Sequence, residues 1–176
     1  MDEPMVRVEG LKKYFSTARG LLHAVDDVTM SIQKGHTVGI VGESGCGKST
    51  LGRTIIHLLD KTNGKIFLEG EDISDVKGRE LKKVREKMQI IFQDPYSSID
   101  PKKSIRETVR EPLKVSKRYS RAEIEERTDE LMNLVGIDER LKGAYPHELD
   151  GGRRQRVGIA RALSLDPKFI VCDEPV

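Results

Sequence analysis

The sequence predicts an α/β fold in which a strand-rich N-terminal part and a helical insert belong to one domain. Short apolar or alternating segments, typical of strands, occur in the first third at residues 6–8, 25–32 and 37–41. The middle, residues 94–165, begins with chain-breaking Asp-Pro pairs and then carries helix patterns. Residues 169–172 form another apolar run. We therefore expect strands on both sides of a helical insert.

The size and charge of the chain exclude several classes of protein. Its 176 residues suffice for one domain with a core. With 31 Lys and Arg against 29 Asp and Glu, the net charge is +2, which does not favour nucleic-acid binding. No apolar run approaches the roughly 20 residues of a membrane span, and the acidic N-terminus does not resemble a signal peptide. The sequence therefore predicts a cytoplasmic protein that reaches a membrane only through a partner.

The cysteines give no sign of a disulfide or zinc framework. Cys46 and Cys172 are the only two, and neither belongs to a CxxC pair. We expect both thiols to be reduced.

The strands and helices of the first half follow from local composition. Residues 37–41 are short and β-branched, which predicts a buried strand. Residues 49–59 have the composition of a helix. Strands are expected at residues 65–68 and 89–92, with a charged helix at residues 79–87 between them.

The insert is expected to contain two helices, at residues 104–113 and 120–135. Ser120 and Glu123 have the spacing of a capping box. One face of the second helix is formed by Ile124, Thr128, Leu131 and Val135. This face predicts a helix that packs on a core.

A glycine-rich loop carries the strongest functional signal. Residues 42–49 match G-x-x-x-x-G-K-[ST], between an expected strand and an expected helix. Glycines let backbone N–H groups point at phosphate oxygens, while Lys48 adds charge and the Ser49 hydroxyl can ligate Mg²⁺. The pattern predicts the core of a P-loop NTPase of the RecA-like type. The expected nucleotide ligands are Gly42, Ser44, Gly45, Cys46, Gly47, Lys48, Ser49 and Thr50.

Two alternatives accompany this loop. A chance glycine-rich turn is disfavoured, because the bare pattern arises by accident in roughly one chain in a hundred. Cys46 could act as a redox switch, but a small side chain that fills space is the favoured interpretation.

Two carboxylates end the apolar run at residues 169–172. In a P-loop fold, Asp173 is expected near Mg²⁺, and Glu174 can polarise the attacking water as a general base. A strand that simply emerges into solvent is the alternative. The upstream phosphate loop favours the catalytic interpretation.

Three further segments resemble those of ABC ATPases and stand in the family order. Residues 89–95 resemble the Q-loop, residues 147–163 resemble the signature and its helix, and Asp166-Pro167 leads into the acidic strand. The resemblance runs from about residue 6 to the last residue. Residues 10–15, 92–98 and 111–113 are similar to the importer group for oligopeptides, dipeptides and nickel.

The resemblance implies an ATP-binding and ATP-hydrolysing subunit that energises an ABC importer, with oligopeptides or dipeptides favoured as cargo. It implies ATP and Mg²⁺ as cofactors, with Gln93 reaching the metal and the attacking water. Phe15 would stack on adenine, with Tyr14 as the alternative, and either ring could instead be a hydrophobic plug. The helical subdomain, residues 94–165, would grip a coupling helix of a membrane subunit, while residues 1–93 and 166–176 would bind nucleotide.

The same resemblance implies the partners. They are a second ABC ATPase subunit, in a homodimer or heterodimer, transmembrane permease subunits and, indirectly, a peptide-binding protein. Nucleic acid is not an expected partner. The chain would lie at the inner face of the cell membrane.

The signature segment departs from the family pattern, which begins Leu/Phe-Ser-Gly-Gly-Gln. In the family, that serine helps hold the γ-phosphate of ATP bound to the opposite subunit, at a helix N-terminus. Here Asp150 stands in place of the serine, and Asp150, Gly151 and Gly152 are the expected ligands at this position, with Arg153 after them. The Asp150 carboxylate would cap the helix well. Yet this carboxylate and a phosphate at about 4 Å would repel each other by roughly 1 to 4 kcal/mol. We expect a weakened half-site, with part of the repulsion offset by Arg153, which could pair either with phosphate or with Asp150.

The end of the chain is a second departure. Family members continue past Glu174 through a D-loop aspartate, a switch histidine and further strands. All four histidines, His23, His36, His57 and His147, precede this point. Missing C-terminal strands would leave an apolar sheet edge exposed. Two alternatives stay open: a subunit that binds nucleotide without hydrolysis, and an ABC ATPase acting on nucleic acid or ribosomes, which the near-neutral charge disfavours.

Overall fold

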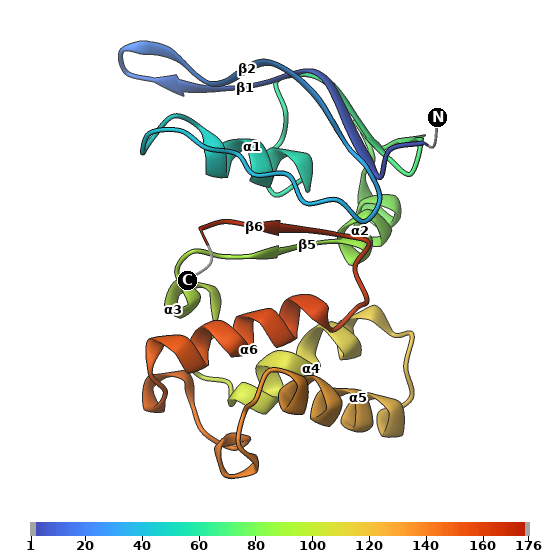
Figure 1. Ribbon diagram of the computed structural model, residues 1–176, viewed down its shortest axis with the longest axis vertical. Helices are drawn as coiled ribbons and strands as arrows, with labels where there is room; N and C mark the ends of the chain where they lie inside the picture. The colour runs from blue at the N-terminus through green and yellow to red at the C-terminus, as the bar shows by residue number, and fades with distance from the viewer. Residues whose placement is uncertain (1–2, 175–176) are drawn as a thin grey trace. The chain divides into compact units, whose positions relative to one another are not determined.

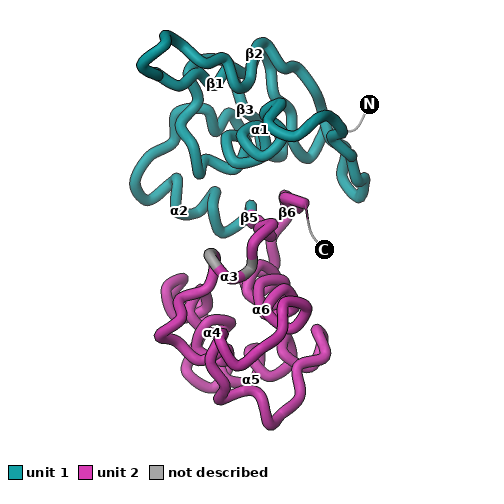
Figure 2. Tube along the Cα trace, turned by 90° about the vertical axis from the view of Figure 1, so that its left-hand side faces the viewer, with its two compact units in different colours: residues 1–88 teal, residues 89–176 magenta. Residues whose placement is uncertain are grey.

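The computed structural model describes residues 3–174, apart from the side chains of Pro95 and Ser97. The predicted chain end at Pro175 and Val176 therefore lies outside the described residues. The chain folds as two compact units, residues 1–88 and residues 89–176 (Figure 2). The expected nucleotide-binding core, residues 1–93 and 166–176, and the expected helical subdomain, residues 94–165, do not coincide with these two units. That functional division stays a prediction.

The first unit contains a four-stranded sheet in the order β2-β1-β3-β4. The strands are β1 (Val6–Thr17), β2 (Gly20–Ile32), β3 (Asn63–Leu68) and β4 (Glu71–Asp72). β1 pairs antiparallel with β2 and β3, and Figure 1 shows β1 and β2 as one long hairpin. The predicted strands at residues 6–8, 25–32 and 65–68 are confirmed. The first two are longer than expected, because the outer hairpin is partly solvated and shows no clear alternation.

The core of this unit lies on one face of the sheet. Val6, Val8 and Leu11 of β1 are almost fully buried, as are Ile66 and Leu68 of β3. Successive side chains of a strand point to opposite faces, so Val6 and Val8 meet the same core, as do Ile66 and Leu68. The register shift between Val8 and Leu11 brings Leu11 to that core as well. This buried face holds the β1–β2 hairpin in place, and the hairpin in turn supports the phosphate loop.

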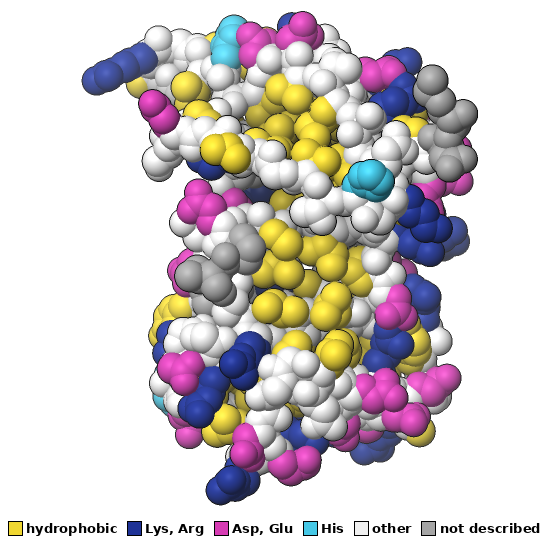
Figure 3. All heavy atoms as spheres, in the orientation of Figure 1, with side chains coloured by type: hydrophobic (Ala, Val, Ile, Leu, Met, Phe, Trp, Pro, Cys, Tyr) yellow, Lys and Arg dark blue, Asp and Glu magenta, His cyan; other side chains and the backbone are white. Residues whose placement is uncertain are grey.

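The predicted buried strand at residues 37–41 is wrong. These residues are assigned to no strand, and the side chains of Val38, Ile40 and Val41 are 45%, 45% and 95% exposed. A strand needs a neighbour for its backbone hydrogen bonds, and among residues 3–174 none pairs with this segment. Figure 3 shows hydrophobic side chains on the surface of this unit. Exposed apolar residues are therefore seen on this unpaired segment, and also at Leu21 and Leu22 of the edge strand β2.

Two helices complete the first unit: α1 (Lys48–Ile55) and α2 (Gly78–Lys87). The helix expected at residues 79–87 is confirmed. The helix expected at residues 49–59 ends early, because His57 adopts a left-handed backbone with φ 58°. The Arg85 guanidinium donates to the His57 carbonyl at 2.6 Å, which ties α2 to the end of α1.

The second unit combines a two-stranded sheet with a helical cluster. β5 (Met88–Ile91) pairs with β6 (Phe169–Cys172). The helices are α3 (Pro95–Ser98), α4 (Ile105–Ser116), α5 (Arg121–Leu134) and α6 (Gly151–Leu163), with short 3-10 turns η1 (Glu139–Leu141) and η2 (Pro146–Glu148). The elements expected at residues 89–92, 104–113, 120–135 and 169–172 are confirmed within a few residues.

Helices α4, α5 and α6 enclose the core of this unit (Figure 1). Ile105, Val109, Met132 and Val157 are fully buried in it. The capping box at the start of α5 is confirmed, because Ser120 and Glu123 exchange side-chain to backbone hydrogen bonds. The apolar face of α5 turns toward this core, as predicted.

An ion-pair cluster ties α4, α5 and the η1 turn together. The Arg106 guanidinium donates to Glu125 at 2.9 Å and to Asp129, and Lys142 reaches Asp129 at 2.8 Å. The hydrogen bond from Arg106 lowers the pKa of Asp129 from 3.8 to about 2. Arg110 joins the cluster through Glu125. These bonds fix the relative positions of two helices outside their apolar contact.

Among residues 3–174, no helix combines the length and the apolar character that crossing a membrane requires.

Candidate nucleotide-binding site

The phosphate loop runs through residues 42–47 and leads directly into α1. Gly45 and Gly47 have φ values of +80° and +100°, which only glycine adopts readily. The Lys48 ammonium donates to the carbonyls of Gly42 and Glu43 at 2.9 and 2.8 Å. The lysine therefore reaches back across the loop from the first residue of the helix. The backbone curls around the amino group as a phosphate-binding loop requires.

The loop lies directly against the backbone of β2. A Cβ atom built on Gly47 would meet the Ala24 carbonyl oxygen at 2.0 Å, well inside van der Waals contact. Only glycine permits this approach. The sequence does not predict the contact with Ala24, because a backbone carbonyl leaves no signal in residue type.

Cys46 is a free, exposed thiol in the middle of the loop. Its sulfur lies 4.0 Å from the Lys48 ammonium, and a Cβ atom on Gly42 would come within 2.7 Å of it. The side chain thus covers the glycine that opens the loop. This position supports the interpretation that Cys46 fills space.

Ser44 lies in the exposed loop, while Ser49 and Thr50 belong to the first turn of α1 and are half-buried. The expected phosphate and metal ligands of the first unit thus occupy one continuous loop and helix start. The helix N-terminus adds the positive end of its dipole to that place.

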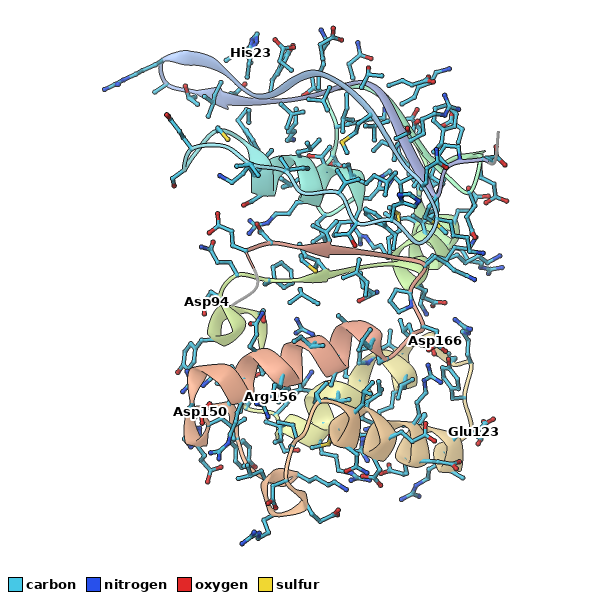
Figure 4. All side chains as sticks on the ribbon, viewed as in Figure 1. His23, Asp94, Glu123, Asp150, Arg156 and Asp166 are labelled. Carbon is cyan, nitrogen blue, oxygen red and sulfur yellow. The ribbon has the colours of Figure 1, made fainter. Side chains whose placement is uncertain are left out.

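The two candidate adenine-stacking rings are in different environments. Tyr14 stacks on His23 with centroids 3.9 Å apart, and its hydroxyl donates to Asp26. This hydrogen bond raises the pKa of Tyr14 and lowers that of Asp26. Phe15, the next residue of β1, is half-buried, with the Lys13 ammonium 4.8 Å from its ring centroid. Because one face of Tyr14 is covered by His23 (labelled in Figure 4), Phe15 is the better candidate for stacking.

The acidic residues of the second unit meet the Q-loop segment. The Asp173 amide donates to the Ile91 carbonyl at 2.9 Å, and Asp173 is only 5% exposed. The exposed Glu174 accepts a hydrogen bond from the Gln93 amide nitrogen at 2.6 Å. Three predicted metal-binding or catalytic residues, Gln93, Asp173 and Glu174, therefore lie together at the ends of β5 and β6.

The signature segment begins α6, as predicted. Asp150 is the N-cap, and its Oδ1 accepts from the Arg153 backbone N–H at 2.7 Å (Figure 4 labels Asp150 at the start of this helix). The Arg153 guanidinium lies 3.3 Å from Oδ2. Gly151 and Gly152 follow and are exposed. The predicted cap is confirmed, and Arg153 pairs with Asp150.

A comparison with known families decides the relationship. A family model described as ABC transporter matches residues 25–176, which is most of the chain. The chain belongs to the ABC transporter family. Two curated relatives from Bacillus subtilis are the oligopeptide transport ATP-binding proteins AppF and OppF, each 46% identical. The matches cover 99% and 100% of this chain, which spans 56% and 58% of the length of these relatives.

Solved structures confirm the fold of this ABC transporter family member. The ATP-binding cassette MJ0796, solved as a dimer bound to ADP and phosphate, aligns with a TM-score of 0.90 at 32% identity. That alignment covers 98% of this chain and 75% of the other. A component of a Clostridium perfringens transporter complex, cbiO1, aligns with a TM-score of 0.81 at 32% identity, over 99% of this chain and 66% of its own. The predicted family and the mixed α/β cassette fold are thus confirmed.

Proposed function

We propose that this chain binds Mg²⁺-ATP and acts as the ATP-hydrolysing subunit of an ABC importer for oligopeptides or dipeptides. The geometry of the phosphate loop carries the proposal: two left-handed glycines, the Lys48 amino group inside the curl, and a helix that starts at the same residue. The peptide cargo is supported by the names of the AppF and OppF relatives.

Different residues would bind the phosphates and the adenine ring. Lys48 and the loop N–H groups carry the donors that phosphate oxygens accept, and Phe15 supplies a flat apolar face for adenine. Within residues 3–174, no three His, Cys, Asp or Glu side chains gather as a metal site. In the first unit, the hydroxyl of Ser49 is a hard oxygen donor of the kind that suits Mg²⁺ completed by phosphate oxygens. In the second unit, the amide oxygen of Gln93 and the carboxylate of Asp173 are donors of the same kind. When bound, the metal supplies positive charge to the phosphates.

The catalytic step assigned to this chain is proton abstraction from water. Glu174 ends β6 with an exposed carboxylate that can act as the general base. Gln93, hydrogen-bonded to it, orients the reacting groups.

The proposed assembly follows the relatives. A second ATPase subunit is supported by the dimeric form of MJ0796, and it can be a copy of this chain or a different one. Permease subunits in the membrane, served indirectly by a peptide-binding protein, would hold the chain at the inner face. Residues 94–165 would contact the permease.

Calorimetry of Mg²⁺-ATP binding to the chain tests the first step. We expect saturable binding, and we expect Lys48→Ala to abolish it while circular dichroism stays unchanged, because the substitution removes only the amino group from the loop. Lys34→Ala, which truncates an exposed lysine outside the loop, is the matched control and should bind as the wild type does. Equal binding by Lys48→Ala and wild type would refute the assignment of the loop.

The cap on α6 favours a second candidate function, a subunit that binds ATP but turns it over slowly. Asp150 occupies the N-terminal N–H group of Arg153 and adds negative charge where a partner's γ-phosphate would approach. At this exposed position, the repulsion is about 1 kcal/mol, or about fivefold in rate.

Asp150→Ser should therefore raise ATP hydrolysis about fivefold in the assembled dimer, measured as phosphate release. Asp138→Ser is the control, because Asp138 caps η1 through the Arg140 N–H and also pairs with that arginine. An unchanged rate in Asp150→Ser would show that the carboxylate does not oppose phosphate.

A further inference from the structure

The hydrogen bond between Gln93 and Glu174 joins residues that lie far apart in the sequence. The amide nitrogen of Gln93 donates to Oε2 of Glu174 at 2.6 Å, a short distance for this kind of bond. Gln93 follows β5 and Glu174 follows β6. The backbone bond from Asp173 to the Ile91 carbonyl extends the pairing of the two strands to this point. The side-chain contact between Gln93 and Glu174 therefore lies directly beyond the paired ends of β5 and β6, and the sheet holds the two residues close together.

The backbone of Glu174 supports a positioning role for this bond. Its φ is +47°, a left-handed conformation that non-glycine residues adopt rarely and that persists only where the surroundings hold it. The preceding amide is held by Ile91, and the side chain is held by Gln93. Strain of this kind gathers at functional sites, because it fixes a group in one orientation.

A carboxamide has two chemically different ends. Its nitrogen only donates hydrogen bonds and its oxygen only accepts them or ligates a metal. With the nitrogen on Oε2 of Glu174, no donor among residues 3–174 occupies the oxygen of Gln93 or Oε1 of Glu174. The first can therefore meet a metal or water, and the second can accept a proton. The two roles of Gln93 can therefore be separated by substitution.

We propose that Gln93 is a positioning residue, whose amide nitrogen fixes the Glu174 carboxylate in the orientation needed for proton abstraction. This inference rests on the proposed ATPase function and adds a role to it. If Gln93 acted only as an oxygen ligand, its effect would be independent of Glu174. If Gln93 acts through Glu174, substitution of either residue should slow the same catalytic step.

A double-mutant cycle on ATP hydrolysis tests this. We expect Gln93→Glu, which keeps an oxygen ligand but loses the N–H donor, to lower kcat about 10- to 100-fold with KM for Mg²⁺-ATP nearly unchanged. In a Glu174→Ala background, Gln93→Glu should cause no further loss, because residues that act as one unit are not additive. A full additional loss in that background would overturn the proposal, as would wild-type kcat in the single variant.

Nuclear magnetic resonance of the chain gives a readout that needs no hydrolysis. The side-chain amide signal of Gln93, identified by its loss in Gln93→Ala, should shift upfield in Glu174→Ala, because a donor bonded to a carboxylate is deshielded. Glu130→Ala, at an exposed position on α5, is the matched control and should leave the signal in place. An unmoved signal in Glu174→Ala overturns the positioning role even in an active protein. A shifted signal in a chain without ATPase activity refutes only the proposed function.

Discussion

Replacing Gly47 with alanine is expected to abolish ATP binding. The added Cβ atom would stand 2.0 Å from the Ala24 carbonyl oxygen, and an alanine would have to adopt φ +100°. The strand backbone cannot yield cheaply, because β2 is held to β1 on both sides of Ala24, by the pairs His23 with Tyr14 and Val25 with Lys13. The loop must therefore leave β2, and its N–H groups lose their common direction.

We expect the affinity for Mg²⁺-ATP to fall by more than about 100-fold, or about 2.7 kcal/mol, together with a lower melting temperature. Calorimetry and thermal denaturation measure the two effects. Gly39→Ala is the matched control, since a Cβ atom at Gly39 meets nothing within 4 Å. Wild-type affinity in Gly47→Ala would show that contact between the loop and β2 is dispensable for binding.

Removing the charge of Asp129 is expected to destabilise the helical cluster. This carboxylate accepts hydrogen bonds from Arg106 and Lys142, and Lys142 is itself nearly buried. Asparagine keeps the shape but leaves two cations without their shared anion. Hydrogen bonds to charged groups are worth about 1.5–3 kcal/mol, and partial exposure of Asp129 reduces the loss to about 1–2 kcal/mol. The melting temperature should fall by about 2–8 °C.

The pH dependence of this effect has a definite sign. Arg106 lowers the pKa of Asp129 from 3.8 to about 2, so the folded state binds the proton less tightly than the unfolded state does. The stabilisation is complete above about pH 4 and is lost as the pH falls toward about 2. Melting temperatures between pH 2 and 7 should therefore converge for wild type and Asp129→Asn only at the acid end.

Asp138→Asn is the control for this series, because Asp138 pairs with the exposed Arg140 and keeps its backbone cap as asparagine. It should change the melting temperature little. Equal melting temperatures for Asp129→Asn and wild type at neutral pH would contradict the stabilising role of the cluster.

The sequence alone determined the features that depend on local chemistry. The loop at residues 42–49, the capping box of Ser120 and Glu123 and the Asp150 cap were all predictable, because each uses residues within a few positions of one another. The family followed from these motifs and their order. Whether the loop, Gln93 and Glu174 perform catalysis stays a prediction.

Only the tertiary structure decided what depends on partners distant in the sequence. Residues 37–41 have the composition of a buried strand, but a strand also needs a neighbour, and the described chain gives them none. The contact of Gly47 with Ala24 and the bond from Gln93 to Glu174, 81 residues away, likewise leave no local pattern. Hydrophobic periodicity and motif spacing report on neighbours along the chain, whereas these contacts are set by how strands pair in space.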